Sequence, residues 1–231
     1  MNFSQKPPEM EIPVDPTPDK DEHLYEKTFS PRDPPLSDDF LEVIQNPLIP
    51  KEVKEELSAL HKKIVELEKL ALTDRLTGLP NREEFHKALD WLFALNERRG
   101  HEKTKFSLVA FDLDGFKAVN DNFGHQAGDK CLQLVASKVG EVTRTSDVFA
   151  REGGDEFLIL LPDVGDEGAQ ILAEKVFKAI TNNVTEELKK MYPGTQGISA
   201  SIGVISYATD SENNYGNFDK NDLVKYVDYV R

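Results

Sequence analysis

The sequence predicts an α/β protein of the α+β kind, with a ferredoxin-like βαββαβ core in which an antiparallel sheet carries helices on one face. Two observations lead to this fold class. Short apolar runs alternate in a fixed order with amphipathic helical segments along residues 81–207. Two of the runs are joined by Gly153 and Gly154, and a glycine pair of this kind is typical of a β-hairpin turn. A helical linker precedes the core.

Hydrophobic periodicity gives the elements of the core in order. In the first predicted helix, Phe85, Leu89, Leu92 and Phe93 share one face. The predicted helices span residues 81–97, 128–142 and 167–183. The predicted strands span residues 106–112, 148–151, 157–161 and 198–207, where apolar residues run together or alternate.

Residues 1–50 differ in composition from the rest of the chain. They hold ten of the thirteen prolines, and eleven acidic residues against four lysines or arginines. Such a segment cannot bury enough apolar surface to order itself, so we expect a largely disordered, Pro-rich acidic region. Within it, residues 37–44 could form one short helix, capped by Ser37, that docks on another surface. The alternative is a solvated remnant of a larger region.

Residues 51–73 carry the heptad pattern of a coiled coil. Apolar residues recur at alternating steps of four and three, with Lys and Glu between them: Val53, Leu57, Leu60, Ile64, Leu67 and Ala71. About three heptads are marginal alone, which suggests help from the domain that follows. The regular seam and its polar flanks favour a linker helix that pairs in parallel with a second copy. The alternative is a helix packed on its own domain. The domain itself is expected at residues 74–231.

Composition limits the functions open to the chain. The formal net charge of −14 disfavours non-specific binding to nucleic acid or anionic lipid, because a polyanion repels both. The single cysteine, Cys131, excludes an internal disulfide framework and fits a reducing compartment. No apolar run approaches the roughly 18 residues of a membrane span, and the N-terminus lacks the features of a signal peptide. We therefore expect a soluble, cytoplasmic protein.

Carboxylates mark the ends of two predicted strands. Asp155 and Glu156 follow the glycine pair of the hairpin, and Asp112 and Asp114 end the strand upstream. Carboxylate oxygens are hard ligands that suit Mg²⁺. The sequence therefore predicts a divalent cation held between neighbouring strand ends.

Three separated motifs, in this order, resemble the GGDEF family of diguanylate cyclases. They are residues 72–82 (Leu-Thr-Asp-Arg-Leu-Thr-Gly-Leu-Pro-Asn-Arg), the stretch from Asp112 to Asp129, and residues 153–157 (Gly-Gly-Asp-Glu-Phe). The resemblance covers residues 72 to about 228. It implies a palm similar to nucleotidyl cyclase catalytic domains, and an enzyme that condenses two GTP molecules into cyclic di-GMP and two pyrophosphates. It also implies a homodimer, since each domain binds one GTP.

The resemblance further implies roles for particular residues. Phosphoryl transfer needs charge neutralisation and alignment more than covalent chemistry, and carboxylates with Mg²⁺ or Mn²⁺ supply both. The implied metal ligands are Asp112, Leu113 and Asp155. The implied catalytic residues are Asp155, Glu156 and Lys117. The implied GTP-binding residues are Gly115, Phe116, Lys117, Asn120, Asp129, Gly153 and Gly154.

Asn120 and Asp129 are the residues that the resemblance places on the guanine ring. A carboxylate can accept from both N1–H and the exocyclic amine, a donor pair that adenine lacks, so Asp129 favours GTP over ATP. The alternative for Asp129 is helix capping alone, with its carboxylate in the first turn of the predicted helix 128–142.

Arg144 and Asp147 precede the glycine pair in the register of the family's product-inhibition site. The resemblance implies that cyclic di-GMP binds there, with Arg144 on phosphate or guanine and Asp147 on guanine N–H groups. Lys175 on the next helix is a further candidate. The alternative is a surface ion pair worth under about 1 kcal/mol.

The C-terminus gives a further expectation, and two other functions stay open. Family members continue into a helix whose basic residues reach the terminal phosphate, whereas residues 223–231 begin that helix and stop, so we expect a shortened chain with weaker GTP binding. A rival function is a non-catalytic receptor for GTP or cyclic di-GMP that signals through its coiled coil. A cyclase that makes a mixed or mononucleotide product also stays open.

Overall fold

The structure is a computed structural model and describes residues 38–98 and 105–208. Its helices are α2 (Asp38–Gln45), α3 (Lys51–Leu72), α4 (Arg82–Arg98), α5 (Phe116–Phe123), α6 (His125–Gly140), α7 (Asp166–Lys178) and α8 (Thr185–Met191). A π-helical stretch, η1 (Ala179–Val184), joins α7 to α8. The strands are β1 (Lys105–Asp114), β2 (Val148–Gly153), β3 (Glu156–Pro162) and β4 (Ser199–Ala208).

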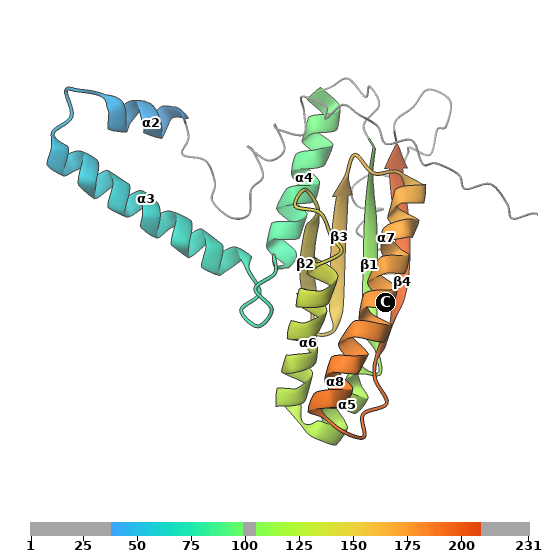
Figure 1. The fold of residues 1–231 in the computed structure, drawn as a ribbon. Coiled ribbons are helices and arrows are strands. Elements are labelled where there is room, and N and C mark those ends of the chain that lie inside the picture. The colour runs from blue at the N-terminus through green and yellow to red at the C-terminus, as the bar shows by residue number, and fades with distance from the viewer. Residues whose placement is uncertain (1–37, 99–104, 209–231) are drawn as a thin grey trace, which may run out of the picture.

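The four strands form one antiparallel sheet in the order β2-β3-β1-β4. Along the chain, β1 is followed by α5 and α6, then by the β2–β3 hairpin, then by α7 to α8 and β4 (Figure 1). This βαββαβ order, with the first strand paired to the last, is the ferredoxin-like arrangement. The predicted fold class is therefore confirmed.

One face of the sheet is covered by the helices that cross over between strands. Val109, Phe111 and Leu113 of β1 belong to an apolar cluster that also holds Cys131 of α6 and Val176 of α7. Alternate residues of a strand point to opposite faces, so these three side chains share one side. Cys131 is fully buried in this cluster, where its thiol acts as a small apolar side chain.

The opposite face is covered by α4. Leu108 and Ala110 of β1 pack in a second cluster with Phe85 and Leu89 of α4. The prediction of helices on one face therefore holds for α6 and α7, whereas the leading helix covers the other face. On β1 the second cluster reaches no further than Ala110, so the end of this face beyond Ala110 is left for other side chains.

The helix α5 was missed by the sequence analysis, which predicted no element between residue 112 and residue 128. Only Phe116, Val119 and Phe123 contribute apolar side chains at helical spacing, too few to register as a period. A single residue, Gly124 at a φ of +82°, separates α5 from α6. The following helix consequently begins at His125, before the predicted start.

Two other elements are longer than predicted. β1 continues to Asp114 and pairs with β4 as far as Ser199, so both acids at its end lie inside the sheet. The helix expected to end at residue 183 runs on through η1 and α8, where Val184 and Leu188 continue its buried face. Pairing with β4 sets the end of β1, and packing against the core sets the end of the helix.

The linker helix α3 extends away from the sheet (Figure 1) and has no buried residue along its 22 residues. Leu60, Ile64 and Leu67 of the heptad pattern are 59%, 53% and 55% exposed, so that side of the helix is open. The short helix considered near residue 40 is present as α2, and its Phe40 ring stacks on His61 of α3 with centroids 4.6 Å apart.

Two expectations lie outside the described residues: the extended character of residues 1–37 and the helix begun at residues 223–231. Within residues 38–98 and 105–208, no helix has both the length and the apolar character needed to cross a bilayer.

Candidate functional site

The sheet face that α4 covers changes character toward one end. Its apolar part ends at Ala110 on β1. The next two positions of β1 on that face are Asp112 and Asp114. Asp112 lies between Glu156 of β3 and Ser201 of β4 in the strand register. The structure therefore gathers acidic and polar side chains at one end of the sheet, which we call the acidic end.

Asp112 lies in a concentration of negative charge. Burial raises the pKa of its carboxyl, and the nearby carboxylates of Asp155, Glu156 and Asp114 raise it further. A divalent cation beside these groups would offset both effects. Within residues 38–98 and 105–208, however, no three His, Cys, Asp or Glu side chains already converge as a metal cage. A cation would therefore need further oxygen atoms.

Leu113 can supply such an oxygen only through its main chain. Its side chain is 2% exposed and packs in the core on the other face of the sheet. A backbone carbonyl is a normal ligand of hard cations. The predicted ligands, the Asp112 and Asp155 carboxylates with the Leu113 carbonyl, therefore need no third side chain.

Asp114 is held by the first residues of β4. The hydroxyls of Ser199 and Ser201 each donate to its carboxylate at 3.0 Å. The start of β4 is fixed by Thr185, whose hydroxyl donates to the Ile198 carbonyl at 2.9 Å and accepts from the Ile198 amide at 3.0 Å. The sequence analysis gave these serines no role. Their spacing of two within a strand is the signal that could have placed them on one face with the acids.

The β2–β3 hairpin ends in a tight turn. Gly153 pairs with Glu156, which leaves Gly154 and Asp155 at the tip, and Gly154 has a φ of +55° that favours glycine. Both glycines are exposed, while the two acids are half-buried. The turn therefore presents bare backbone to solvent and carboxylates to the acidic end.

The junction of β1 and α5 has the features of an anion site. Gly115 has a φ of +87° and stands before the first turn of α5, and no side chain among the described residues caps that turn. The N-terminal amides of a helix favour negative charge. Lys117 is exposed in the same turn, and Phe116 packs against the core and anchors it.

Asn120 of α5 packs directly against α6. A methyl group on Gly128 would lie 2.0 Å from the Asn120 Oδ1 atom and 2.8 Å from its Cγ, so glycine is needed to leave room for this side chain. Asp129 follows Gly128 and is exposed. The two predicted guanine-binding residues are thus brought beside one another at the contact between α5 and α6.

The capping interpretation of Asp129 is wrong. α6 begins at His125, and none of the residues in its first turn is acidic. Asp129 therefore lies a full turn past the helix start, whereas a capping carboxylate must stand at the first turn. The side chain is left exposed and available to a ligand.

Arg144, Asp147 and Lys175 line one cavity of about 130 Å³, together with apolar residues such as Leu161 and Ile171. Asp147 Oδ2 accepts a hydrogen bond from the Arg144 amide at 2.7 Å, but its buried Oδ1 has no hydrogen-bond partner among the described residues. Burial raises the pKa of Asp147, against the opposing effect of the Arg144 amide and charge. A buried acceptor of this kind is costly unless a ligand donates to it.

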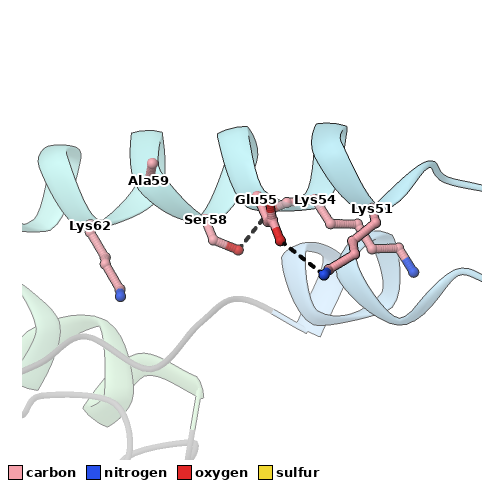
Figure 2. Close-up of a pocket in the computed structure, with 6 residues that line it drawn as sticks. All are labelled: Lys51, Lys54, Glu55, Ser58, Ala59 and Lys62. Atoms are coloured by element: carbon pink, nitrogen blue, oxygen red, sulfur yellow. Dashed lines mark hydrogen bonds and ion pairs between the residues drawn. The ribbon is translucent and has the colours of Figure 1, made fainter.

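A larger hollow of about 390 Å³ lies on α3 and has no comparable chemistry (Figure 2). The Lys51 ammonium pairs with the Glu55 carboxylate at 3.5 Å, and the Ser58 hydroxyl donates to the Lys54 carbonyl at 2.8 Å. All of these contacts are within one helix, so this surface is a solvated helix face rather than a candidate site.

Comparison with known proteins identifies the family of this chain. Residues 71–225 match the family model described as "Diguanylate cyclase, GGDEF domain". The chain belongs to the GGDEF family. Its acidic end, its hairpin turn and its contact between α5 and α6 all lie within the matched residues.

Two curated relatives carry the name of diguanylate cyclase. Diguanylate cyclase DgcP of Pseudomonas aeruginosa is 38% identical over 128 residues, which are 55% of this chain and 19% of that protein. Diguanylate cyclase A of Treponema denticola is 36% identical over 149 residues, which are 64% of this chain and 38% of that protein. The GGDEF chain therefore spans well under half the length of these relatives.

A solved structure of similar fold is the coiled coil and GGDEF domain of DgcB from Caulobacter crescentus, in complex with c-di-GMP. Its TM-score to this chain is 0.57 at 28% sequence identity, and the match covers 68% of this chain and 80% of that chain. The GGDEF chain thus has the nucleotidyl cyclase palm fold that GGDEF domains share.

Proposed function

We propose that this chain carries a diguanylate cyclase domain, which joins two GTP molecules into cyclic di-GMP and releases two pyrophosphates. Each 3′-hydroxyl attacks the α-phosphate of the other nucleotide, and each attack displaces one pyrophosphate. The observation that carries the proposal is the acidic end, where Asp112, Asp155 and Glu156 gather next to the uncapped start of α5. Because the substrate is GTP, we place the domain in the cytoplasm.

The acidic end suits Mg²⁺ or Mn²⁺. Asp112 and Asp155 would hold the cation through their carboxylates and Leu113 through its carbonyl, which makes an all-oxygen donor set. When bound, the cation neutralises the charge of the reacting phosphates. The repulsion among the carboxylates around Asp112 is a reason for these residues to accept it.

The phosphates of GTP would lie between the hairpin turn and the start of α5. The backbone of Gly153 and Gly154 can approach a phosphate closely because it carries no Cβ atoms. The amides near Gly115 and Phe116 donate to phosphate oxygens, and Lys117 supplies a positive charge. Glu156 would accept a hydrogen bond from the attacking 3′-hydroxyl, a role that suits a carboxylate on the same sheet end.

The guanine ring would bind at the contact between α5 and α6. Asp129 accepts from N1–H and the exocyclic amine as a pair, and Asn120 adds a hydrogen bond from the neighbouring helix. ATP leaves the Asp129 carboxylate facing an acceptor, so the domain should reject it.

Two copies of the domain are needed, since one domain supplies one GTP. We propose that the open heptad side of α3, with Leu60, Ile64 and Leu67, pairs in parallel with a second copy. Such pairing raises the effective concentration of the two domains and orients them. The coiled coil that adjoins the GGDEF domain in the DgcB structure supports this arrangement.

Cyclic di-GMP would return to the cavity at Arg144, Asp147 and Lys175 as an inhibitor. The Asp147 Oδ1 atom, which has no hydrogen-bond partner among the described residues, can accept a guanine N–H. The positive side chains of Arg144 and Lys175 can neutralise phosphate. The presence of c-di-GMP in the DgcB structure supports a product site on this kind of domain.

Incubation with GTP and Mg²⁺, with products identified by mass, tests the proposed reaction. We expect cyclic di-GMP from the wild-type chain and none from Asp155→Ala. Glu174→Ala is the matched control, because it removes an exposed carboxylate of α7 that pairs with Lys178 at 3.7 Å. A wild-type rate in Asp155→Ala would contradict the metal assignment, and a mixed or mononucleotide product would contradict the reaction.

A non-catalytic receptor is the second candidate function. It is favoured by one observation, the cavity with the unpartnered Asp147 oxygen, which does not depend on the acidic end. A receptor would bind cyclic di-GMP in calorimetry and form no product from GTP with either Mg²⁺ or Mn²⁺. Turnover of GTP would exclude it.

A further inference from the structure

A short loop joins α3 to α4 and is closed at its base. Residues 73–80 begin and end in a β-bridge between Thr73 and Pro80. Inside the loop, the Asp74 amide donates to the Leu79 carbonyl and the Gly78 amide donates to the Asp74 carbonyl, both at 2.8 Å. The loop is therefore a hydrogen-bonded unit rather than a free tether.

Asn81 joins both helices to this loop. Its main-chain amide donates to the Leu72 carbonyl at 2.9 Å, and its side-chain amide donates to the Ala71 carbonyl at 2.7 Å. Its Oδ1 atom accepts from the Glu84 amide at 3.1 Å, which caps the first turn of α4. Asn81 thus ties the end of α3 to the start of α4, in addition to the bridge between Thr73 and Pro80.

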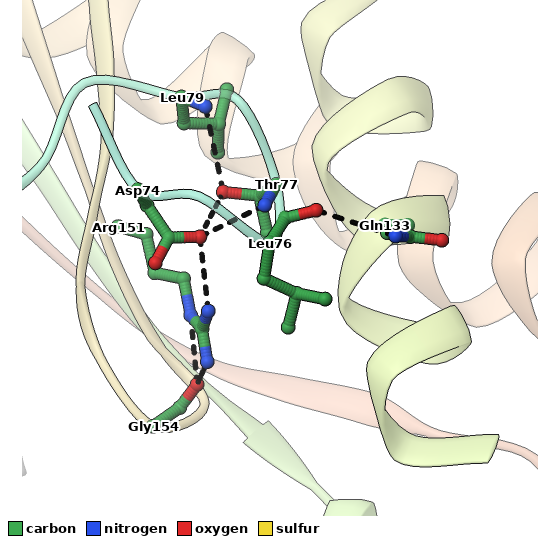
Figure 3. Close-up of polar contacts among 7 residues, drawn as sticks. All are labelled: Asp74, Leu76, Thr77, Leu79, Gln133, Arg151 and Gly154. Atoms are coloured by element: carbon green, nitrogen blue, oxygen red, sulfur yellow. Dashed lines mark hydrogen bonds and ion pairs between the residues drawn. The ribbon is translucent and has the colours of Figure 1, made fainter. Parts of the chain in front are cut away.

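Asp74 is the central acceptor of the loop (Figure 3). Its Oδ1 atom accepts from the Thr77 amide at 2.9 Å, from the Thr77 hydroxyl at 2.6 Å and from Arg151 Nη1 at 3.0 Å. Burial alone would raise the pKa of Asp74, but these hydrogen bonds and the Arg151 charge hold it below its usual value. The carboxylate is therefore a permanent anchor for Arg151 at neutral pH.

Arg151 of β2 connects this anchor to the hairpin turn. Its Nε and Nη2 atoms both donate to the Gly154 carbonyl, at 3.0 and 2.6 Å, so one guanidinium spans Asp74 and Gly154 (Figure 3). Its main-chain amide also donates to the Pro80 carbonyl at 2.9 Å. The Arg151 side chain is only 12% exposed, so water competes little for these contacts. A planar fork makes these contacts from three nitrogen atoms in one fixed geometry, whereas an ammonium group has all its donors on a single nitrogen.

We propose that Asp74 and Arg151 are positioning residues. They hold the tip of the hairpin turn in place, so that the Asp155 carboxylate lies beside Asp112 at the acidic end. Gly154 is the residue before Asp155, and glycine gives the tip little conformational restraint of its own. The Arg151 contact supplies the restraint from outside the turn. The catalytic consequence of this proposal rests on the proposed function, whereas the order of the tip does not.

The same loop contacts the helix that carries the guanine-binding candidate. The Leu76 carbonyl accepts from Gln133 Nε2 at 3.3 Å, one turn beyond Asp129 on α6 (Figure 3). Leu76 and Leu79 also pack against the core cluster of that face. The loop is thus a common support for the two parts of the domain that would bind the phosphate and base ends of one nucleotide.

Three variants test the proposal by their effect on turnover. Arg151→Met removes the fork, Arg151→Lys keeps the charge without the fork, and Asp74→Ala removes the anchor. We expect Arg151→Met to lower kcat about tenfold with the KM for GTP changed less than about threefold, since the guanine contacts are untouched. Arg151→Lys should lie between Arg151→Met and wild type. Lys178→Met, which breaks an exposed ion pair, is the matched control and should leave kcat unchanged.

Nitrogen-15 relaxation of residues 153–155 in the full chain gives a readout independent of activity. We expect the order parameters of these amides to fall from about 0.85 in wild type to below about 0.6 in Arg151→Met and Asp74→Ala, and to stay high in Lys178→Met. Unchanged order in Arg151→Met and Arg151→Lys would overturn the proposal, as would lower order with wild-type kcat. If the wild-type chain makes no product, the proposed function fails and the order parameters alone decide the positioning role.

Discussion

Two aspartates of this GGDEF domain share a raised pKa but sit among opposite neighbours. Burial is the first cause at both Asp112 and Asp147. At Asp112 the surrounding charges are carboxylates, which raise the pKa further. At Asp147 the neighbour is Arg144, whose amide and positive charge lower it. The charges around Asp112 are negative, whereas Asp147 has a positive neighbour and one buried oxygen, Oδ1, that accepts no hydrogen bond from the described residues. The same residue type therefore marks two candidate sites with different chemistry.

Replacing Asp112 by Asn should disable the first site and spare the second. Asn keeps the shape of the side chain but removes the charge that a divalent cation requires. Product formation should fall at least about 100-fold, while the affinity for cyclic di-GMP stays within about twofold. Turnover assays and calorimetry with cyclic di-GMP measure the two effects. Loss of cyclic di-GMP binding in this variant would mean that the two sites are not independent.

Replacing Arg144 by Ala should have the reverse effect. The affinity for cyclic di-GMP should fall about 10- to 100-fold, because a charge-assisted contact is lost and the neighbouring Asp147 is left without its positive partner. Uninhibited turnover should be unchanged. Lys175→Met serves as a graded comparison with a smaller loss, since a lysine offers only a point charge. Inhibition curves with added cyclic di-GMP distinguish these outcomes from a general loss of folding.

Replacing Gly128 by Ala tests whether the position of Asn120 matters for GTP. The new methyl group would meet the Asn120 amide, so we expect the KM for GTP to rise about tenfold with little change in kcat. Alanine favours a helix by about 1 kcal/mol over glycine, so thermal stability should not fall through helix propensity. Ser137→Ala on the exposed side of α6 is the control. A wild-type KM would show that Asn120 does not contribute to GTP binding.

A third carboxylate, Asp74, sharpens the comparison because its pKa is lowered. A lowered folded-state pKa means that ionised Asp74 stabilises the fold above its usual value of 3.8, and that this contribution disappears as the pH falls through the folded-state pKa. The difference in Tm between wild type and Asp74→Asn should therefore be full at pH 7 and should close below pH 3.8.

Asp147→Asn should give the opposite slope. Since the pKa of Asp147 is raised, the folded state binds that proton more tightly than the unfolded state, and wild-type stability at this residue declines as the pH rises above 3.8. The Tm of Asp147→Asn relative to wild type should therefore improve over that range. Thermal melts of both variants at several pH values check the two signs, and parallel slopes would contradict the contrast between these residues.

The sequence was sufficient to predict the acids at the strand ends because each pair adjoins an apolar run: Asp112 and Asp114 stand at the end of one, and Asp155 and Glu156 stand directly before another. It could not predict which residues lie beside them. Ser201 reaches Asp114 through the β1–β4 register, and register is a property of the folded sheet rather than of either strand alone. Asp74 and Arg151 are 77 positions apart and meet only when the hairpin packs beside the loop after α3.

The errors at α5 and α6 have a related cause. A helix as short as α5 has too few apolar positions to produce a detectable helical period, so no helix was predicted around Asn120. With α5 missing, the next helix was started too late, and Asp129 was given a capping alternative that its position excludes. The pairing of Asn120 with Gly128 then depended on a helix contact that local sequence does not encode.

The three hydrogen bonds of Asn81 restrain the angle between α3 and α4 at their junction. If two chains pair along α3, a twist of the paired helices could not be taken up by bending at this junction. The twist would instead change the relative orientation of the two domains and of the nucleotides they carry. The geometry of the encounter would then depend on Asn81, through both its main-chain amide and its side chain.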